Sequence, residues 1–359
     1  MFRYTIFALS SVFLWISTIS ADEVSIPQLR KNAIRFLKLT QNPDGSWTKN
    51  EFVGVTGLVT AALLKSGVAP EDPMVAAGIK NLVSQEKADG GFYAKDSLHR
   101  NYETCITVMA LTEANKDGRY DTHMKKAQSF LKGLQWDEGE GAESSDPAFG
   151  GGGYGSHERP DMSNTQYFVE ALNKSGVEPD DEAMKRVLVF LSRSQNLESV
   201  FNDTKFAGLI NDGGFYYPPA AGGDSKAGVE ENGGLRSYGS MTYAGLKSLI
   251  YAGLERNDPR VAAATEWIRK HYTLAENPGV GQQGLFYYFH TFAKTMDVIA
   301  SEKFTDAEGN DHNWRAELRN RLAKLQQPNG SWLNPADRWY EGDPNLVTAY
   351  SLLALSYCE

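Results

Sequence analysis

The chain has 359 residues, a formal net charge of -9 and a hydrophobic content of 41%. This acidic balance opposes binding to nucleic-acid phosphates and to anionic lipid surfaces, so we expect no nucleic-acid partner. With only two cysteines, Cys105 and Cys358, a disulfide framework is excluded and a hydrophobic core must hold the fold.

The first segment, residues 1–21, has the pattern of a secretory signal peptide. Arg3 precedes a mostly apolar run from Ile6 to Ile19, and acidic residues begin at Asp22. The apolar run is too short to cross a bilayer comfortably, although an uncleaved anchor is the alternative. We therefore expect an exported protein, periplasmic or extracellular, with no transmembrane segment after the signal is removed.

One pattern then recurs: an amphipathic helix, a turn in which Gly precedes an aromatic residue, and a second helix that contains Thr. The turn is clearest as Gln-Asn-Pro-Asp-Gly-Ser-Trp at 41–47 and as Gln-Gln-Pro-Asn-Gly-Ser-Trp at 326–332. The recurrence predicts one domain, residues 22–359, made of six repeats. The repeats span about 28–67, 74–115, 124–176, 182–253, 260–300 and 314–357.

The two helices of each repeat differ in polarity. The first has apolar residues at three- and four-residue spacing, as at Ala33, Phe36 and Leu37, so it buries one face. The second is apolar over longer runs, as at 246–252, which predicts deeper burial. The Thr near its start is expected to cap an orphan backbone amide. We predict an all-α fold, an α/α toroid of six helix pairs, with the N-terminal ends of the inner helices converging on one mouth.

The turns at 41–47 and 326–332 resemble the Gln-to-Trp repeat signature of the squalene-hopene cyclase and protein prenyltransferase β-subunit superfamily. At the level of the repeats, the resemblance covers essentially the whole chain after the signal. It implies an α/α toroid with an apolar central cavity that takes an isoprenoid-like ligand.

The chemistry that the resemblance implies is only partly matched by this sequence. The cyclases of the superfamily open one inner helix with Asp-x-Asp-Asp, whose middle Asp protonates an alkene; here Ser163 stands at that place, after Asp161. A hydroxyl is too weak an acid for that step, which disfavours polyene cyclisation. The prenyltransferases would need Asp, Cys and His ligands for zinc. Cys105 and Asp343 are present without a matching His, so we expect no metal and no cofactor.

The residues that flank the recurring Thr form the candidate site. The candidate catalytic residues are Asp161, Glu103 and His290, because a neutral imidazole opposite a carboxylate can act as a general base. Each also has a structural interpretation, since carboxylates are favoured at helix N-termini and a buried His usually bonds a neighbour. The candidate ligand-binding residues, mostly aromatic as suits an apolar ligand, are Tyr102, Asn164, Tyr167, Tyr238, Tyr243, Tyr288, Phe289 and Tyr350.

The expected function is that of an exported, terpenoid cyclase-like protein that binds an isoprenoid or other apolar small molecule. If it is an enzyme, cyclase-, isomerase- or lyase-like chemistry is favoured over protein prenyl transfer. Two alternatives stay open. One is a non-catalytic binding or scaffold toroid. The other is an exported carbohydrate-active enzyme, a lyase or glycosidase, with Glu103 and Asp161 as its carboxylate pair.

Overall fold

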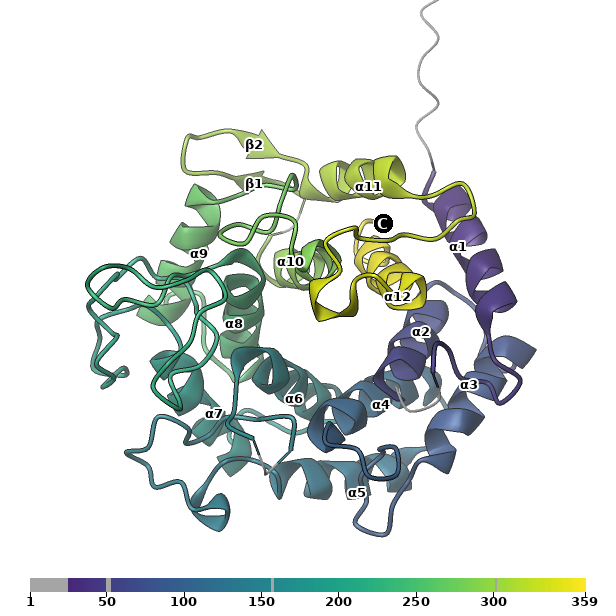
Figure 1. Ribbon diagram of the computed structural model, residues 1–359, viewed down its shortest axis with the longest axis horizontal. Coiled ribbons are helices and arrows are strands. Elements are labelled where there is room, and N and C mark those ends of the chain that lie inside the picture. The colour runs from purple at the N-terminus through teal and green to yellow at the C-terminus, as the bar shows by residue number, and fades with distance from the viewer. Residues whose placement is uncertain (1–24, 50–52, 156–157, 301) are drawn as a thin grey trace, which may run out of the picture.

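The computed structural model describes residues 25–49, 53–155, 158–300 and 302–359, and the predicted export signal lies outside them. In these ranges the α-helices alternate between two concentric rings (Figure 1). The outer ring comprises α1 (Ile26–Thr40), α3 (Pro73–Ser84), α5 (Asp121–Lys132), α7 (Glu182–Arg193), α9 (Pro259–Lys270) and α11 (Trp314–Leu325). The inner ring comprises α2 (Val53–Lys65), α4 (Arg100–Ala114), α6 (Met162–Lys174), α8 (Gly239–Tyr251), α10 (Leu285–Ile299) and α12 (Pro344–Leu355).

The inner ring is closed. Each inner helix packs against the next along the chain, and α12 returns to pack against both α2 and α10. The predicted all-α arrangement of inner and outer helices is therefore confirmed. Its additions are a short antiparallel pair, β1 (Phe304–Thr305) and β2 (Asp311–His312), and two 3-10 turns, Glu138–Glu140 and Arg338–Tyr340.

The rings differ in burial as their sequences predict. In α1, Leu29, Ala33 and Leu37 recur every four residues and are at most 1% exposed, which gives one buried stripe. In α12, every residue from Asn345 to Leu355 is buried. None of the helices in the described ranges is long and apolar enough to cross a membrane.

The repeated glutamine connects neighbouring units. The Gln41 side-chain amide donates to the carbonyl of Gly45 in its own turn, at 3.1 Å, and to that of Met74 in α3, at 2.9 Å. Gln326 makes the same two contacts, and its second one, to Leu29 of α1 at 3.0 Å, joins the last unit to the first. One amide thus holds a turn closed and fixes the spacing of two units.

The recurring threonines bond to the turns rather than capping their own helices. Thr56 accepts a hydrogen bond from the backbone amide of Trp47 at 3.1 Å, and Thr348 accepts one from Trp332 at 3.1 Å. The expectation of a Thr cap was wrong because these residues lie inside the helix, past the cap position. The cap of α12 comes from Asp343 instead.

Side chains fill the interior of the ring beyond the first turns of the inner helices. Glu170 on α6 pairs with Lys247 on α8 and with Lys294 on α10, each at 2.5 Å. The side chains of all three residues are at most 1% exposed. Because α8 lies between α6 and α10 in the ring, the pair of Glu170 with Lys294 reaches across the interior, whereas the pair with Lys247 joins neighbouring helices. The continuous apolar cavity that the resemblance implies is therefore replaced, at this depth, by an ion cluster.

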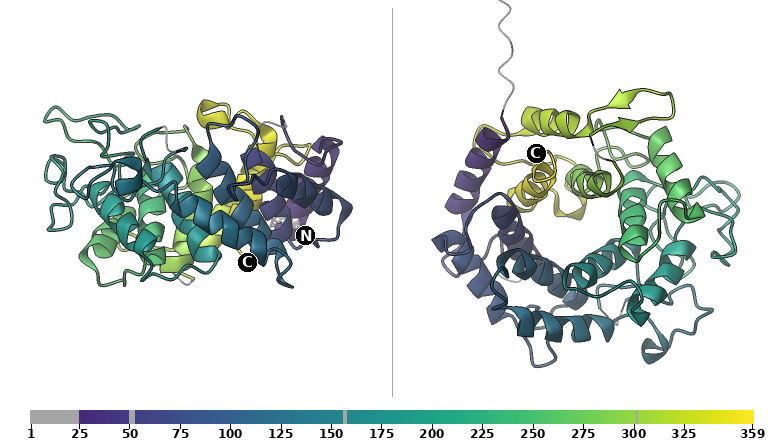
Figure 2. Two further views of the ribbon diagram at one scale, coloured as in Figure 1. Left: turned by 90° about the horizontal axis from the view of Figure 1, so that it is seen from below. Right: turned by 180° about the vertical axis from the view of Figure 1, so that it is seen from behind.

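Edge-on, the molecule is a flattened ring with two unlike faces (Figure 2, left). The long loops between α7 and α8 and the segment that leads into α12 rise on the same face, and the C-terminus lies at the opposite face. The inner helices begin at the loop-bearing face, which is the predicted mouth.

Candidate functional site

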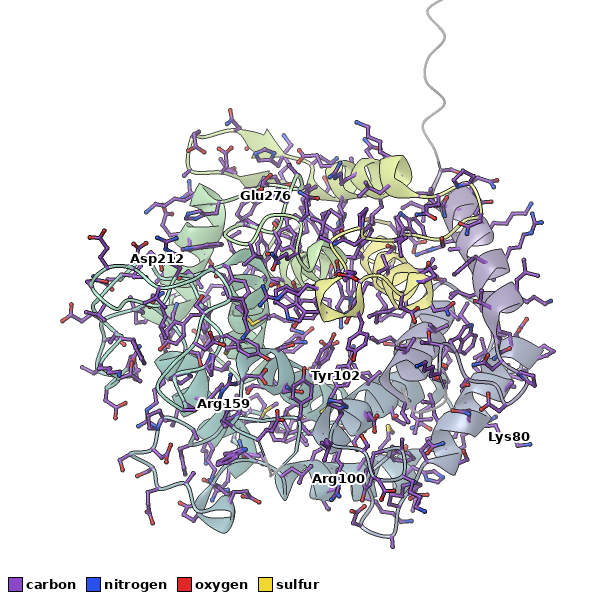
Figure 3. The ribbon with its side chains drawn as sticks, in the orientation of Figure 1. Lys80, Arg100, Tyr102, Arg159, Asp212 and Glu276 are labelled. Carbon is purple, nitrogen blue, oxygen red and sulfur yellow. The ribbon has the colours of Figure 1, made fainter. Side chains whose placement is uncertain are left out.

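A pocket of about 250 Å³ lies where the inner helices begin. Every inner helix contributes to its wall, and most of the wall is apolar. Figure 3 shows Tyr102 close to the centre of the ring, whereas Lys80 lies at its outer edge. Of the predicted ligand-binding residues, the pocket brings together Tyr102, Asn164, Tyr167, Tyr238 and Tyr350.

Four tyrosine rings meet across this pocket. Tyr102 packs edge-on against Tyr167, with ring centroids 5.3 Å apart, and Tyr287 packs edge-on against Tyr350 at 5.8 Å. Tyr167 and Tyr287 connect the two pairs at 6.3 Å. Burial raises the pKa of all four hydroxyl groups far above the ordinary value, so each keeps its proton.

Three predicted ligand-binding residues do not line the pocket. Tyr243 packs against Tyr288, with ring centroids 5.5 Å apart, and the Tyr288 hydroxyl donates to the carbonyl of Thr273 at 2.7 Å. Phe289 packs edge-on against Phe286. The reason is helix geometry, since each residue turns by about 100° relative to the previous one. With Tyr287 facing the pocket, Tyr288 and Phe289 must face elsewhere.

Glu103 and Asp343 are the carboxyl groups in the pocket wall, and Asp343 is used as the cap of α12. Glu103 is 3% exposed and accepts a hydrogen bond from the backbone amide of Ala94 at 3.1 Å. Burial raises its pKa to about 7. A carboxyl group with that pKa can both donate and accept a proton near neutral pH.

Asp161 acts as the cap of α6. Its carboxylate accepts from the Asn164 backbone amide at 2.9 Å and from the Asn164 side chain at 2.8 Å. Burial raises its pKa in spite of these bonds. Asp161 lies behind the pocket-lining residues, at their helix terminus, so the geometry gives it a structural task. Its catalytic role stays a prediction.

His290 lies one turn deeper than Tyr287 on α10. It is 1% exposed, its ring centroid is 5.3 Å from that of Tyr350, and neither ring nitrogen has a hydrogen-bond partner among the described residues. Burial holds its pKa well below the ordinary value, so the ring is neutral. The predicted pairing with Glu103 or Asp161 is not formed, and neither is a bond to Tyr288.

Some site residues were missing from the predicted set. Tyr287 was expected at the mouth, because it flanks the recurring Thr of its unit, but it was not among the predicted ligand-binding residues. Tyr154 and Tyr217 each lie two residues after the turn residue whose backbone amide donates to the recurring Thr, so an alignment of the turns could have found them. Trp339 and Tyr340 come from the segment before α12, which has no counterpart in the other units.

The ion cluster was also missed, although its members carried a signal. Glu170, Lys247 and Lys294 are charged residues within stretches that the repeat pattern assigns to buried inner helices.

No group of three or more His, Cys, Asp or Glu side chains within the described ranges is arranged to hold a metal ion.

Comparison with known proteins agrees with this architecture. Residues 50–217 match the family model of the squalene-hopene cyclase C-terminal domain. A search of curated proteins finds no sequence match. Among solved structures, the type II terpene cyclase MstE from Scytonema superposes with a TM-score of 0.53 at 14% identity, covering 92% of this chain and 98% of that one.

Two carbohydrate-active proteins share the fold as well. A polysaccharide lyase superposes with a TM-score of 0.57 at 10% identity, covering 92% of this chain and 96% of that chain. A family 76 glycoside hydrolase from a bovine Bacteroides thetaiotaomicron strain gives 0.56 at 11% identity, covering 91% of this chain and 77% of that chain. At these identities the likeness concerns the fold alone. Residues 50–217 are thus similar to a squalene-hopene cyclase domain, and the closed double ring is a fold shared with a terpene cyclase and with carbohydrate-active proteins.

Proposed function

We propose that the mouth pocket binds a small molecule with an apolar, isoprenoid-like body. The observation that carries this proposal is the mostly apolar pocket of about 250 Å³, walled by tyrosine rings from four inner helices. Pockets of this kind suit apolar ligands that a few polar groups orient. The MstE cyclase, which shares the fold, binds geranylgeranyl dihydroxybenzoate.

The size of the pocket limits the ligand. Sites for drug-sized ligands typically enclose roughly 300 to 1,000 Å³. A pocket of about 250 Å³ lies just below that range, and the ion cluster of Glu170, Lys247 and Lys294 fills the interior beyond it. A ten-carbon isoprenoid is therefore a better probe than a long polyene.

The chemistry of the wall favours binding or mild acid–base catalysis over polyene cyclisation. Ser163 takes the place of the cyclase acid and lines the pocket. Glu103, with a pKa of about 7, is a far weaker acid than alkene protonation requires, but it suits proton transfer to oxygen or nitrogen. Glu170 is held ionised by its two lysines and so has no proton to give.

Calorimetric titration with geraniol tests the proposal. Leu346 lines the pocket at the start of α12, so Leu346→Trp should fill it and weaken binding at least about tenfold. The matched exchange Leu39→Trp, on the outer face of α1 where Leu39 is 76% exposed, should leave binding unchanged. Ser163→Leu offers a second, smaller blocking change. Equal affinity in all variants, or no binding by the native chain, would contradict the proposal.

A second candidate function is action on a carbohydrate. Tyrosine hydroxyl groups and the Glu103 carboxyl group in one pocket can also bind and process a sugar ring, since Tyr and Glu both serve as general acids or bases. Release of reducing or unsaturated sugars from polysaccharides, blocked by Glu103→Gln, would favour this function. A chain that binds neither ligand class would favour the scaffold alternative.

Export also belongs to the proposal. It rests on the basic start, short apolar core and acidic continuation of residues 1–23. N-terminal sequencing of the protein from its host should begin near Asp22.

A further inference from the structure

The buried ion cluster under the pocket is connected to the pocket wall. Lys247 donates not only to Glu170 but also to the side-chain oxygen of Gln166, at 2.7 Å. Gln166 lies one turn nearer to the mouth on α6, and its side-chain nitrogen is 3.4 Å from the Tyr287 hydroxyl oxygen. Tyr287 lines the pocket. A hydrogen-bond chain thus runs from the ion cluster to the ligand space.

The ammonium group of Lys247, at the buried end of this chain of hydrogen bonds, fixes which group donates and which accepts. An ammonium group has donors only, so the Gln166 oxygen must face Lys247 and the Gln166 nitrogen must face Tyr287. Tyr287 therefore accepts from Gln166, and its own hydrogen is free to point elsewhere. Hydrogen bonds in such a chain polarise one another, and the lysine charge strengthens the donor at the far end.

The hydrogen bond between Ser163 and Tyr287 still leaves one hydroxyl hydrogen available to a ligand. Its hydroxyl oxygen is 3.2 Å from that of Tyr287, and either one can donate to the other. If Tyr287 donates, the hydrogen of Ser163, which lines the pocket, is left to point into it; if Ser163 donates, the hydrogen of Tyr287 is left. Both arrangements present a donor to whatever occupies the inner end of the pocket.

The buried charges below the pocket also favour a ligand group that accepts hydrogen bonds. Glu170 accepts from both lysines, and burial of its carboxylate is offset so strongly by them that its pKa stays well below the ordinary value. One carboxylate thus faces two lysine side chains, with the neutral ring of His290 beside them, and burial lowers the pKa of both lysines, that of Lys294 to about 7. Stability alone gives little reason for such a cluster, since apolar replacements of buried ion pairs are often neutral or stabilising.

We infer that the inner end of the pocket is a binding site for an acceptor oxygen, a carboxylate or carbonyl oxygen, at the end of an apolar ligand. Whichever of Tyr287 and Ser163 keeps its hydrogen free donates to that oxygen, and the chain through Gln166 to Lys247 orients and polarises this donor. The ligand then enters with its oxygen-bearing end first and leaves its apolar body against the tyrosine rings. This inference rests on the proposed function, because it specifies the ligand of the same pocket.

Three ten-carbon probes that share one isoprenoid chain test it at neutral pH. Geranate carries acceptors only, geranylammonium carries donors only, and geraniol carries both. Calorimetry should show geranate binding at least about tenfold more tightly than geranylammonium, because each hydrogen bond to a charged partner is strong in a buried site. The Tyr287→Phe and Gln166→Leu variants should both lose most of that preference, and Gln166→Leu, which lies outside the pocket lining, should keep its affinity for geraniol within about threefold.

The control is Tyr120→Phe, directly before outer helix α5, which removes a hydroxyl group far from the chain of donors and should change nothing. Where Tyr287→Phe fails to fold, Ser163→Ala tests the same donor site with a smaller change. Equal binding of geranate and geranylammonium, or preference for the ammonium, would overturn the inference and leave the proposed function standing. Failure of all three probes to bind would overturn both.

Discussion

Two glycines in the first repeat show how one backbone conformation can serve two purposes. Gly45 and Gly67 have nearly the same positive φ, +87° and +86°. A Cβ atom on Gly45 would lie 2.3 Å from the carbonyl oxygen of Ala77 in α3, whereas one on Gly67 would meet nothing within 4 Å. Gly67 therefore supplies only the left-handed conformation, and Gly45 also lets the turn touch the neighbouring unit.

Alanine at the two positions should separate these purposes. Gly67→Ala is expected to lower the free energy of unfolding by about 1 kcal/mol, the cost of a left-handed non-glycine residue. Gly45→Ala should lower it by at least about 3 kcal/mol, because backbone of α3 must move as well. Urea unfolding of both variants measures the difference. Equal losses would mean that the close approach at Gly45 is not needed.

The carboxyl group of Glu103 links pocket chemistry to stability. Its pKa in the folded state is about 7, above its ordinary value, so the unfolded chain loses this proton first as pH rises. Stability should therefore fall as pH increases from about 4.5 to 7 and level off above that, by on the order of 3 kcal/mol for this group. Burial raises the pKa of Glu341 to about 7 too, so it acts in the same window.

Glu103→Gln should remove its share of this pH slope, as followed by thermal unfolding at several pH values. The control is Glu178→Gln at an exposed position, which should leave the slope as it is. An unchanged slope in Glu103→Gln would show that the proton on Glu103 is held no more tightly in the folded state than in the unfolded one.

At the scale of the helices, the buried ion pairs of Glu170 are the contacts with the largest expected effect on stability. Glu170 joins α6 to α8 and α10 through two fully buried ion pairs. Removing one charge leaves the others without compensation, which is costly, whereas removing all of them avoids the desolvation that the cluster requires.

The Glu170→Gln variant should therefore lose about 3 to 5 kcal/mol of stability. The combined variant Glu170→Leu, Lys247→Met, Lys294→Met should recover most of that loss, and it should lose the preference for geranate. Thermal midpoints of the two variants provide the comparison. A combined variant as unstable as Glu170→Gln would mean that the cluster is a net source of stability.

For the whole molecule, the sequence repeat predicted the double ring of helices but not the side-chain contacts inside it. Trp47 and Trp332 occupy equivalent places, and the indole nitrogen of each donates to a carbonyl of its own unit at 2.8 Å, so a local pattern was enough to find them. The partners Glu170 and Lys294 are 124 residues apart on helices that are not consecutive, and no local pattern reports such a contact. Trp339 and Tyr340 of the pocket wall could not be found from the repeat either, since they lie in a segment that only the last unit has.

The most direct test of the account is a crystal structure of the protein grown with saturating geraniol. We expect one ligand at the mouth of the ring, with its chain against the rings of Tyr102, Tyr167 and Tyr350 and its oxygen within hydrogen-bond distance of Tyr287 or Ser163. A ligand bound only on the outer helices, or a pocket that stays empty at saturation, would contradict it.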